Sequence, residues 1–203
     1  MAISRFSTSS VAQGLPKYQK LWDGTSAVFD SDYELIERVN VGAGGSSSIS
    51  FSSIPSTYRH LQVRAFHRAT TGAGDGTIFM RFNSDSGSNY SSHRLYGYGG
   101  SLGSDSSVNA TAVSAGHSMG ATPSLQGFSV MINDILDYAN ASKYKTVRSL
   151  AGTDLNGDAS GAIFFNSGNW RSNSTITSIT ITTNQTSFAQ YSTFALYGIK
   201  GAS

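Results

Sequence analysis

The part of the sequence that comes closest to a catalytic motif is residues 116–120 (GHSMG). It matches the G-x-S-x-G nucleophile elbow, a strained turn between a strand and a helix that exposes a reactive serine. That chemistry needs a histidine after the serine, whereas all four histidines precede Ser118. Residues 121–124 (ATPS) would also break a helix directly after the motif. We therefore interpret the motif as a chance match in a Gly- and Ser-rich chain, and we expect no catalytic residues.

Metal and phosphate sites are equally poorly supported. Residues 154–158 (DLNGD) offer oxygen ligands, but Phe165 stands where a calcium loop needs its bidentate glutamate. We interpret this stretch as a β-turn, with an opportunistic surface Ca²⁺ as the alternative. Residues 72–76 (GAGDG) predict a hairpin loop, because no helix follows that could bind phosphate at its N-terminus. His60 and His67 would face opposite sides of one strand, and the chain has no cysteine. We expect no metal site and no cofactor.

Aromatic residues in predicted loops are the remaining candidates for ligand contact. Tyr96, Tyr98 and Trp170 stand next to glycine or asparagine residues. Sugars bind by stacking on such rings together with fixed hydrogen bonds, so a glycan contact at these three residues is one hypothesis. The alternative, which we favour, is that these rings pack against neighbouring loops or a second subunit.

The composition indicates a folded protein with few charges. Charged residues make up 13% of the 203 residues, against roughly 25% in an average globular protein. Ser, Thr, Asn and Gly replace them, which suits strand faces, turns and subunit contacts. The net charge of +2 comes without clusters of Lys and Arg, so we expect no nucleic-acid partner. No apolar run has the length of a membrane helix or of a signal-peptide core, so we expect a soluble protein with no membrane partner.

From residue 33 onwards, apolar residues alternate with Ser, Thr and other polar residues. The alternation predicts strands over residues 34–41, 46–54, 61–67, 77–83, 127–136, 144–150, 162–167, 176–183 and 193–199. Residues 95–126 predict long loops with one or two strands. About nine or ten strands with frequent turns indicate an all-β fold. We therefore predict a single antiparallel β-sandwich of the jelly-roll type over residues 33–203.

The first 32 residues differ from this domain, because they show neither the strand period nor the helical period. They carry five large apolar residues that cannot build a core by themselves: Leu15, Tyr18, Leu21, Trp22 and Phe29. A frayed terminus would leave this apolar surface in water. We therefore favour an extended anchoring arm over residues 1–32, which becomes ordered on another subunit.

Several stretches of the sequence resemble accessory virion proteins of tailed bacteriophages from aquatic bacteria. They are residues 33–41, 42–45, 49–55, 58–64 (YRHLQVR), 82–90, 135–150, 169–171 and 188–200. The resemblance implies a component of the phage particle, and it carries no catalytic residues. Members of this group are variously placed on tails, fibres or heads.

These observations together predict a non-enzymatic structural protein on the exterior of a phage particle, tail- or fibre-associated. The arm would anchor it to other virion proteins. The sandwich would form a homo-oligomer, for which we expect a trimer. One alternative is a capsid decoration (cement) protein. Another is a lectin-like module that recognises host surface glycans. A hydrolase that does not use a serine triad also remains open.

Overall fold

The computed structural model describes residues 32–70, 75–120, 127–154 and 161–201. These residues form twelve β-strands and no helix, so the predicted all-β class is confirmed. The strands are β1 (Tyr33–Asn40), β2 (Ser48–Phe51), β3 (His60–His67), β4 (Asp75–Phe82), β5 (Tyr90–Tyr98), β6 (Ser101–Ala110), β7 (Val113–Met119), β8 (Ser129–Leu136), β9 (Lys145–Thr153), β10 (Ala162–Trp170), β11 (Ile179–Thr183) and β12 (Thr193–Ile199). No helix that could span a membrane is found in this part of the chain.

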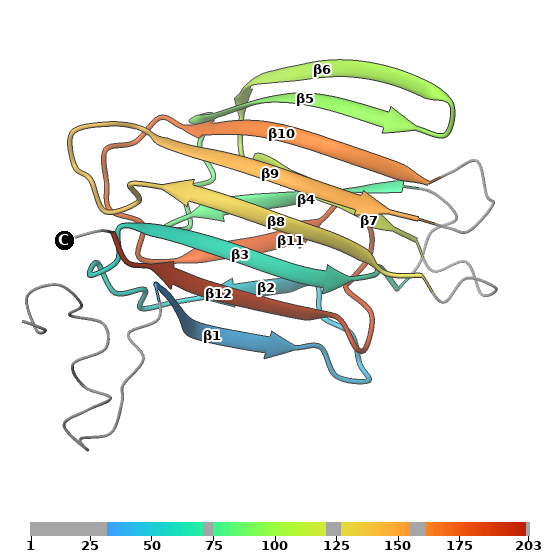
Figure 1. Ribbon diagram of the computed structural model, residues 1–203, viewed down its shortest axis with the longest axis horizontal. Helices are drawn as coiled ribbons and strands as arrows, with labels where there is room; N and C mark the ends of the chain where they lie inside the picture. The colour runs from blue at the N-terminus through green and yellow to red at the C-terminus, as the bar shows by residue number, and fades with distance from the viewer. Residues whose placement is uncertain (1–31, 71–74, 121–126, 155–160, 202–203) are drawn as a thin grey trace, which may run out of the picture. The chain divides into compact units, whose positions relative to one another are not determined.

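The strands form two antiparallel sheets (Figure 1). The large sheet has eight strands in the order β1-β12-β3-β8-β9-β10-β5-β6, and the small sheet has four in the order β2-β11-β4-β7. Figure 1 shows the large sheet in front, with β1 at its lower edge and β6 at its upper edge.

Eight of the twelve strands have the order of a jelly roll. In such a fold, two Greek keys form two four-stranded sheets, and here these are β1-β12-β3-β8 and β2-β11-β4-β7. The other four strands continue the first of these sheets beyond β8, in the order β9-β10-β5-β6. We call these four strands the extension. The described residues from Tyr33 onwards therefore form a jelly roll in which one sheet has eight strands and the other has four.

Alternation of residue type decides which face of each strand is buried. In β9, every second residue from Lys145 to Thr153 is buried, and the residues between them are exposed or half-buried. The core between the sheets is built from residues of both, among them Phe51, Met80 and Ile181 of the small sheet and Leu61, Phe164 and Leu196 of the large sheet. Each such side chain stabilises the fold by about 1.5–3 kcal/mol relative to its exposure to water.

Some of the polar groups inside the sandwich form hydrogen bonds with one another or with the backbone. The hydroxyl groups of Ser129 and Thr153 lie 2.6 Å apart, and the amide of Met119 donates to the Ser129 hydroxyl at 3.0 Å. Lys145 is fully buried, and its ammonium donates to the carbonyl oxygens of Asn140, Lys143 and Asn173. Burial lowers the pKa of the Lys145 ammonium. These bonds connect the turn between β8 and β9 with the segment that follows β10.

Gly168 of β10 faces the small sheet at a point of close approach. A Cβ atom at this position would lie 2.2 Å from Cγ1 of Val113 in β7. Because the valine side chain is stiff, we expect Gly168→Ala to lower the free energy of unfolding by roughly 1–3 kcal/mol. Gly97→Ala is the matched control, since a Cβ there would make only ordinary contacts of 3.5 Å with Ile163 and Leu102. Urea unfolding of both variants measures the difference, and equal losses would contradict this account of Gly168.

The largest departure from the sequence prediction lies in residues 95–126. Instead of long loops with one or two strands, the chain forms three regular strands between residues 90 and 119, namely β5, β6 and β7. The strand predicted over 162–167 also continues to Trp170. The first difference concerns β5 and β6 of the extension and β7 of the small sheet, and the second concerns β10 of the extension.

Candidate binding surface on the outer face of the large sheet

The outer face of the large sheet, which points away from the small sheet, carries a set of exposed large apolar side chains. Each belongs to a central strand or to the extension, and each is between 42% and 89% exposed. They are Phe66 on β3, Val130 and Ile132 on β8, Leu150 on β9, Ile163 and Phe165 on β10, Leu95 on β5 and Leu102 on β6. We call this set the outer patch.

One row of the outer patch crosses four neighbouring strands without interruption. Ile132 lies opposite Leu150, which lies opposite Phe165. Phe165 in turn lies opposite Leu95. Directly opposite residues of a sheet are close enough for their side chains to touch, so these four form a continuous apolar strip.

The other row contains glycines, which bring its apolar residues closer to one another. Ile163 lies opposite Gly97, and Gly97 lies opposite Leu102. Because Gly97 has no side chain, Ile163 and Leu102 both reach the space above it. On the other side of the sheet's centre, Phe66 lies opposite Val130. The two rows run side by side, so the eight residues form a single surface.

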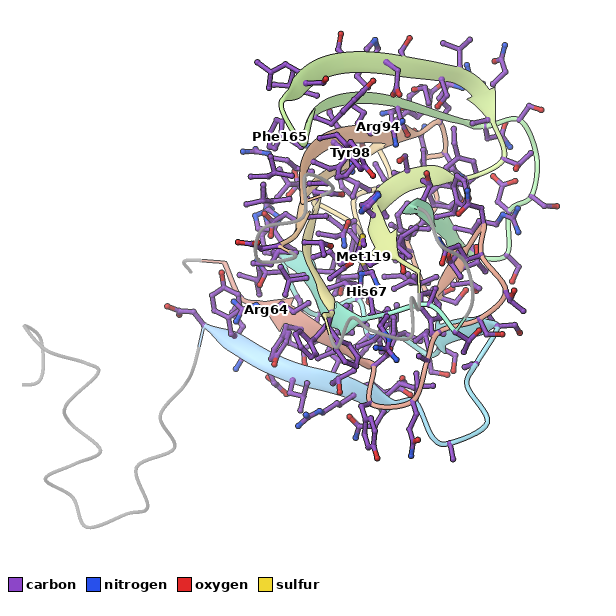
Figure 2. All side chains as sticks on the ribbon, turned by 90° about the vertical axis from the view of Figure 1, so that its right-hand side faces the viewer. Arg64, His67, Arg94, Tyr98, Met119 and Phe165 are labelled. Carbon is purple, nitrogen blue, oxygen red and sulfur yellow. The ribbon has the colours of Figure 1, made fainter. Side chains whose placement is uncertain are left out.

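Figure 2 places this surface relative to the core. Phe165 and Arg64 lie on one side of the large sheet, whereas His67 and Met119 lie on the side that faces the small sheet. His67 is fully buried and Met119 is 7% exposed. The outer patch is therefore not a continuation of the sandwich core but a second apolar surface on the opposite face.

The outer patch is large for a surface that faces water. The exposed parts of its eight side chains amount to roughly 800 Å², if each offers about 150–200 Å² when fully exposed. The largest apolar patch of a typical monomer covers about 300–600 Å², and each partner in a standard protein interface buries about 800 Å². The outer patch therefore has the size of a protein-protein contact.

A polar row borders the outer patch on one side. The Gln62 amide donates to Asp134 at 2.6 Å, and the guanidinium of Arg64 donates to Gln62 at 2.6 Å. Arg148 lies opposite Asp134 on the next strand. An apolar centre with a hydrogen-bonded polar border is the usual anatomy of a protein interface.

The part of the outer patch nearest β6 is hollowed. A shallow, open depression of about 470 Å³ lies there, and its lining includes Leu95 and Phe165 of the outer patch. Its other walls include His93, Ser104 and Ser167. Arg94 and Asp105, which form an ion pair, also line it. A concave apolar floor with polar walls can receive a protruding side chain of a partner.

Comparisons with protein-family models, with curated proteins and with solved structures find no match for this chain. Within the described residues, no group of three or more histidine, aspartate or glutamate side chains could hold a metal ion.

The motif at residues 116–120 does not form a nucleophile elbow. Ser118 lies inside strand β7, opposite Gly76 of β4, and it is fully buried. Its hydroxyl donates to the carbonyl of Met119 at 3.4 Å. The serine is thus part of the sandwich interior rather than of an exposed turn.

Trp170 requires a correction, because it does not present its ring at a loop surface. It is 2% exposed and lies at the end of β10, where its ring stacks on Tyr90 and packs beside Phe82. The indole N–H donates to Asp85 at 2.7 Å and is the main reason why the pKa of that carboxyl is lowered. A sugar cannot stack on this ring, so Trp170 is a core residue.

Tyr96 and Tyr98 also lie on a strand, not in a loop. Both belong to β5 and are half-buried, and the ring of Tyr96 stacks on Phe164 at 5.7 Å. The guanidinium of Arg94 lies 5.3 Å from the centre of the Tyr96 ring. Tyr96 is six positions along β5 from Tyr90, the residue opposite Trp170, which is about 20 Å. The three residues of the glycan hypothesis are therefore not brought together.

Several predicted features lie outside the described residues. They are the five apolar residues of the arm, Leu15, Tyr18, Leu21, Trp22 and Phe29, and most of the turn at 154–158. His60 and His67 occupy opposite faces of β3, as predicted. His60 is half-buried and accepts a hydrogen bond from the amide of Asp137, whereas His67 is fully buried in the core.

Sequence reasoning missed the outer patch, although one signal pointed to it. Residues 162–165 (AIFF) are four consecutive apolar residues, and β8 likewise carries apolar residues at both parities. Such runs are typical of strands that are covered on both faces. The runs therefore indicate strands whose second face also needs a cover.

Proposed function

We propose that this protein is a non-enzymatic structural protein of a phage particle, which acts by forming contacts with other protein subunits. It assembles as a homo-oligomer, with a trimer as the expected form, and sits on the exterior of the particle in a tail- or fibre-associated position. Residues 1–32 anchor it to other virion proteins. The outer patch is the contact surface of the sandwich.

The observation that carries this proposal is the outer patch itself. Burial of roughly 800 Å² of apolar surface would contribute a free energy on the order of 20 kcal/mol, at about 25 cal/mol per Å². This contribution is lost as long as the outer patch faces water. Natural monomers avoid such patches unless a partner covers them. Five of the eight residues lie on the extension, which is the part added to the basic jelly roll. The added strands therefore supply a surface for association.

The fold and the sequence resemblance support the same role. Jelly rolls serve as viral capsid domains and as lectin domains, so the fold alone does not choose between assembly and sugar binding. The stretches that resemble phage virion proteins include β1, most of β3, the β8–β9 turn and β12. The burial of Trp170 weakens the lectin alternative, since it removes one of its three rings from the surface.

Charge placed in the outer patch tests the contact. We expect Leu150→Lys and Phe165→Lys to weaken self-association at least tenfold, because a lysine at the centre of an apolar contact must lose its hydration. Light scattering on size-exclusion fractions measures the mass of each variant. Thr146→Lys is the matched control, since Thr146 is exposed on the same face of β9 but outside the patch. An unchanged mass for both patch variants would sink the contact role.

The place on the particle is tested separately. We expect mass spectrometry of purified heads and purified tails to find the protein with the tails. Deletion of residues 1–32 should abolish incorporation and leave a soluble β-rich oligomer. Detection on heads alone would favour the decoration role, and incorporation without residues 1–32 would contradict the anchoring arm.

A further inference from the structure

The upper edge of the large sheet is formed by β6, which pairs with β5 on one side (Figure 1). Within the described chain, no strand lies on its other side. β6 is ten residues long, and all but two of its residues are exposed. A strand in this position presents a row of N–H and C=O groups that can pair with another strand.

The opposite edge of the same sheet is protected in the usual way. β1 carries Glu34, Glu37 and Arg38 among its eight residues, and its pairing with β12 is interrupted by a bulge between Leu35 and Glu37. Charges and bulges are the devices by which proteins keep edge strands from pairing with other chains.

β6 lacks these devices over most of its length. Its pairing with β5 is regular from Ser101 to Ser107, and the irregularity comes only after that. Its one charged residue is Asp105, and the guanidinium of Arg94 on β5 binds that carboxylate at 3.1 and 3.2 Å. The edge is therefore long, regular and without net charge. The same sheet blocks one of its edges and leaves the other open.

We propose that β6 pairs with β6 of a second copy of this chain, antiparallel and about a two-fold axis perpendicular to the sheet. The two large sheets then become one continuous sheet. An uncharged strand edge is complementary to its own copy under this symmetry. Each N–H group of one copy can donate to a C=O group of the other, and the symmetry repeats the same bond in the opposite direction. This contact goes beyond the proposed function, since it uses the strand edge and not the outer patch.

The register of the pairing follows from Asp105. In an antiparallel pair, residues that lie opposite each other point to the same face of the sheet. The two-fold axis must therefore pass midway between one residue of β6 and the same residue of the second copy. An axis at Asp105 would set two carboxylates opposite each other, which is unfavourable. An axis at Ser104 places Asp105 opposite the partner's Gly103 and Leu102 opposite the partner's Ser106. Ser104 is also the middle residue of the stretch from Ser101 to Ser107 that pairs regularly with β5, so an axis there pairs this whole stretch with its copy. We therefore centre the pairing on Ser104.

This arrangement also acts on the outer patch. Leu102 is 89% exposed, and the strand of the second copy would cover part of it. Because the axis is perpendicular to the sheet, the outer faces of both copies point to the same side. The two outer patches then form one doubled apolar surface. If contacts through the outer patch form a trimer, β6 pairing joins two trimers. If the outer patch forms no contact between copies, β6 pairing gives a dimer.

Single cysteines test the register, because the chain contains no cysteine of its own. We expect Ser104→Cys to form a disulfide-linked dimer under mild oxidation at least tenfold faster than Ser101→Cys or Asn40→Cys. In the proposed register the two Ser101 residues lie six positions apart, about 20 Å, which is beyond disulfide reach. Asn40 is exposed on the protected edge β1. Non-reducing electrophoresis gives the rates, and similar rates at all three positions would overturn the pairing.

A second variant keeps the test independent of oxidation. Sedimentation equilibrium of Ser104→Lys should show at least tenfold weaker association at the β6 contact, because two ammonium groups would face each other across the axis. Thr146→Lys makes the same charge change away from β6 and should leave this association unchanged. The proposal would also be overturned if the parent chain stayed monomeric at high concentration, since β6 would then pair only with a different protein.

The result can be separated from that of the proposed function. Leu150→Lys should leave the Ser104→Cys cross-link intact, because Leu150 lies three strands away from β6. If the cross-link fails while the outer-patch variants still lose self-association, only the β6 pairing is wrong. If the cross-link forms while the outer-patch variants keep their mass, only the role of the patch is wrong.

Discussion

Replacing Trp170 by alanine should lower the free energy of unfolding by about 3–5 kcal/mol. The ring is 2% exposed and fills the end of the core between Phe82 and Tyr90. Its removal leaves a cavity and also takes away the indole N–H that binds Asp85. Urea unfolding measures the loss. Phe165→Ala is the matched control, because it truncates an aromatic ring on the same strand that is 47% exposed. A loss no larger than that of Phe165→Ala would contradict the core role of Trp170.

The hydrogen bond to Asp85 can be separated from the packing. Trp170→Phe keeps an aromatic ring but removes the donor, so we expect a smaller loss, roughly 1–3 kcal/mol. The pKa of Asp85 should rise toward its ordinary value, since the indole bond is the largest cause that lowers it. An NMR titration of the Asp85 carboxyl measures this change. An unchanged Asp85 pKa would show that the indole bond is not what holds it down.

Acidification from pH 7 to pH 4 should lower the free energy of unfolding by about 3 kcal/mol through His67 alone. Burial, with a smaller contribution from nearby His117, lowers the pKa of His67 from 6.5 to about 3. The folded protein therefore holds His67 neutral at pH 4, whereas the unfolded chain takes up a proton below about pH 6.5. Protonation then favours unfolding. The stability is fully present above pH 6.5 and is lost progressively as the pH falls toward 3.

His67→Phe isolates this contribution, because it keeps a ring between Phe188 and Phe194 and removes the titrating group. The difference in stability between parent and variant should change by about 3 kcal/mol between pH 7 and pH 4. Carboxyl groups that titrate in the same range cancel in this difference. Parallel profiles for the parent and His67→Phe would contradict the prediction.

The sequence was sufficient for several strands that carry closely spaced apolar residues between turn residues. The closing strand at residues 193–199 has the same bounds in the prediction and in the structure, and β1 and β3 differ by a residue or so. In β3 the alternation of residue types indicated the strand, and in β12 a short run of apolar residues did so. The all-β sandwich followed from the number of such strands.

β6 could not be predicted in the same way. Its sequence, SLGSDSSVNA, is rich in residues with low strand propensity. It becomes a strand because it pairs with β5 along nearly its whole length, and this partner is known only once the fold is known. The outer patch depends on the same strands, so its position was hidden together with them.

The burial of Trp170 was also beyond the sequence. The surrounding residues 169–171 (NWR) are typical of an exposed loop. The environment of the ring is decided by Asp85 and Phe82, which are more than eighty positions away in the chain. A contact over such a distance leaves no local pattern. Sequence reasoning therefore placed this aromatic residue with the surface rings of the glycan hypothesis.

The position of β12 has a consequence for how the chain acquires its fold. β12 lies between β1 and β3, so β1 has no partner in its sheet until residues up to Ile199 have left the ribosome. Closure of the large sheet therefore waits for β12 and depends on contacts between distant parts of the chain, which places it among slowly folding topologies. A chain that stops before β12 should leave the facing edges of β1 and β3 unpaired, and we expect it to aggregate.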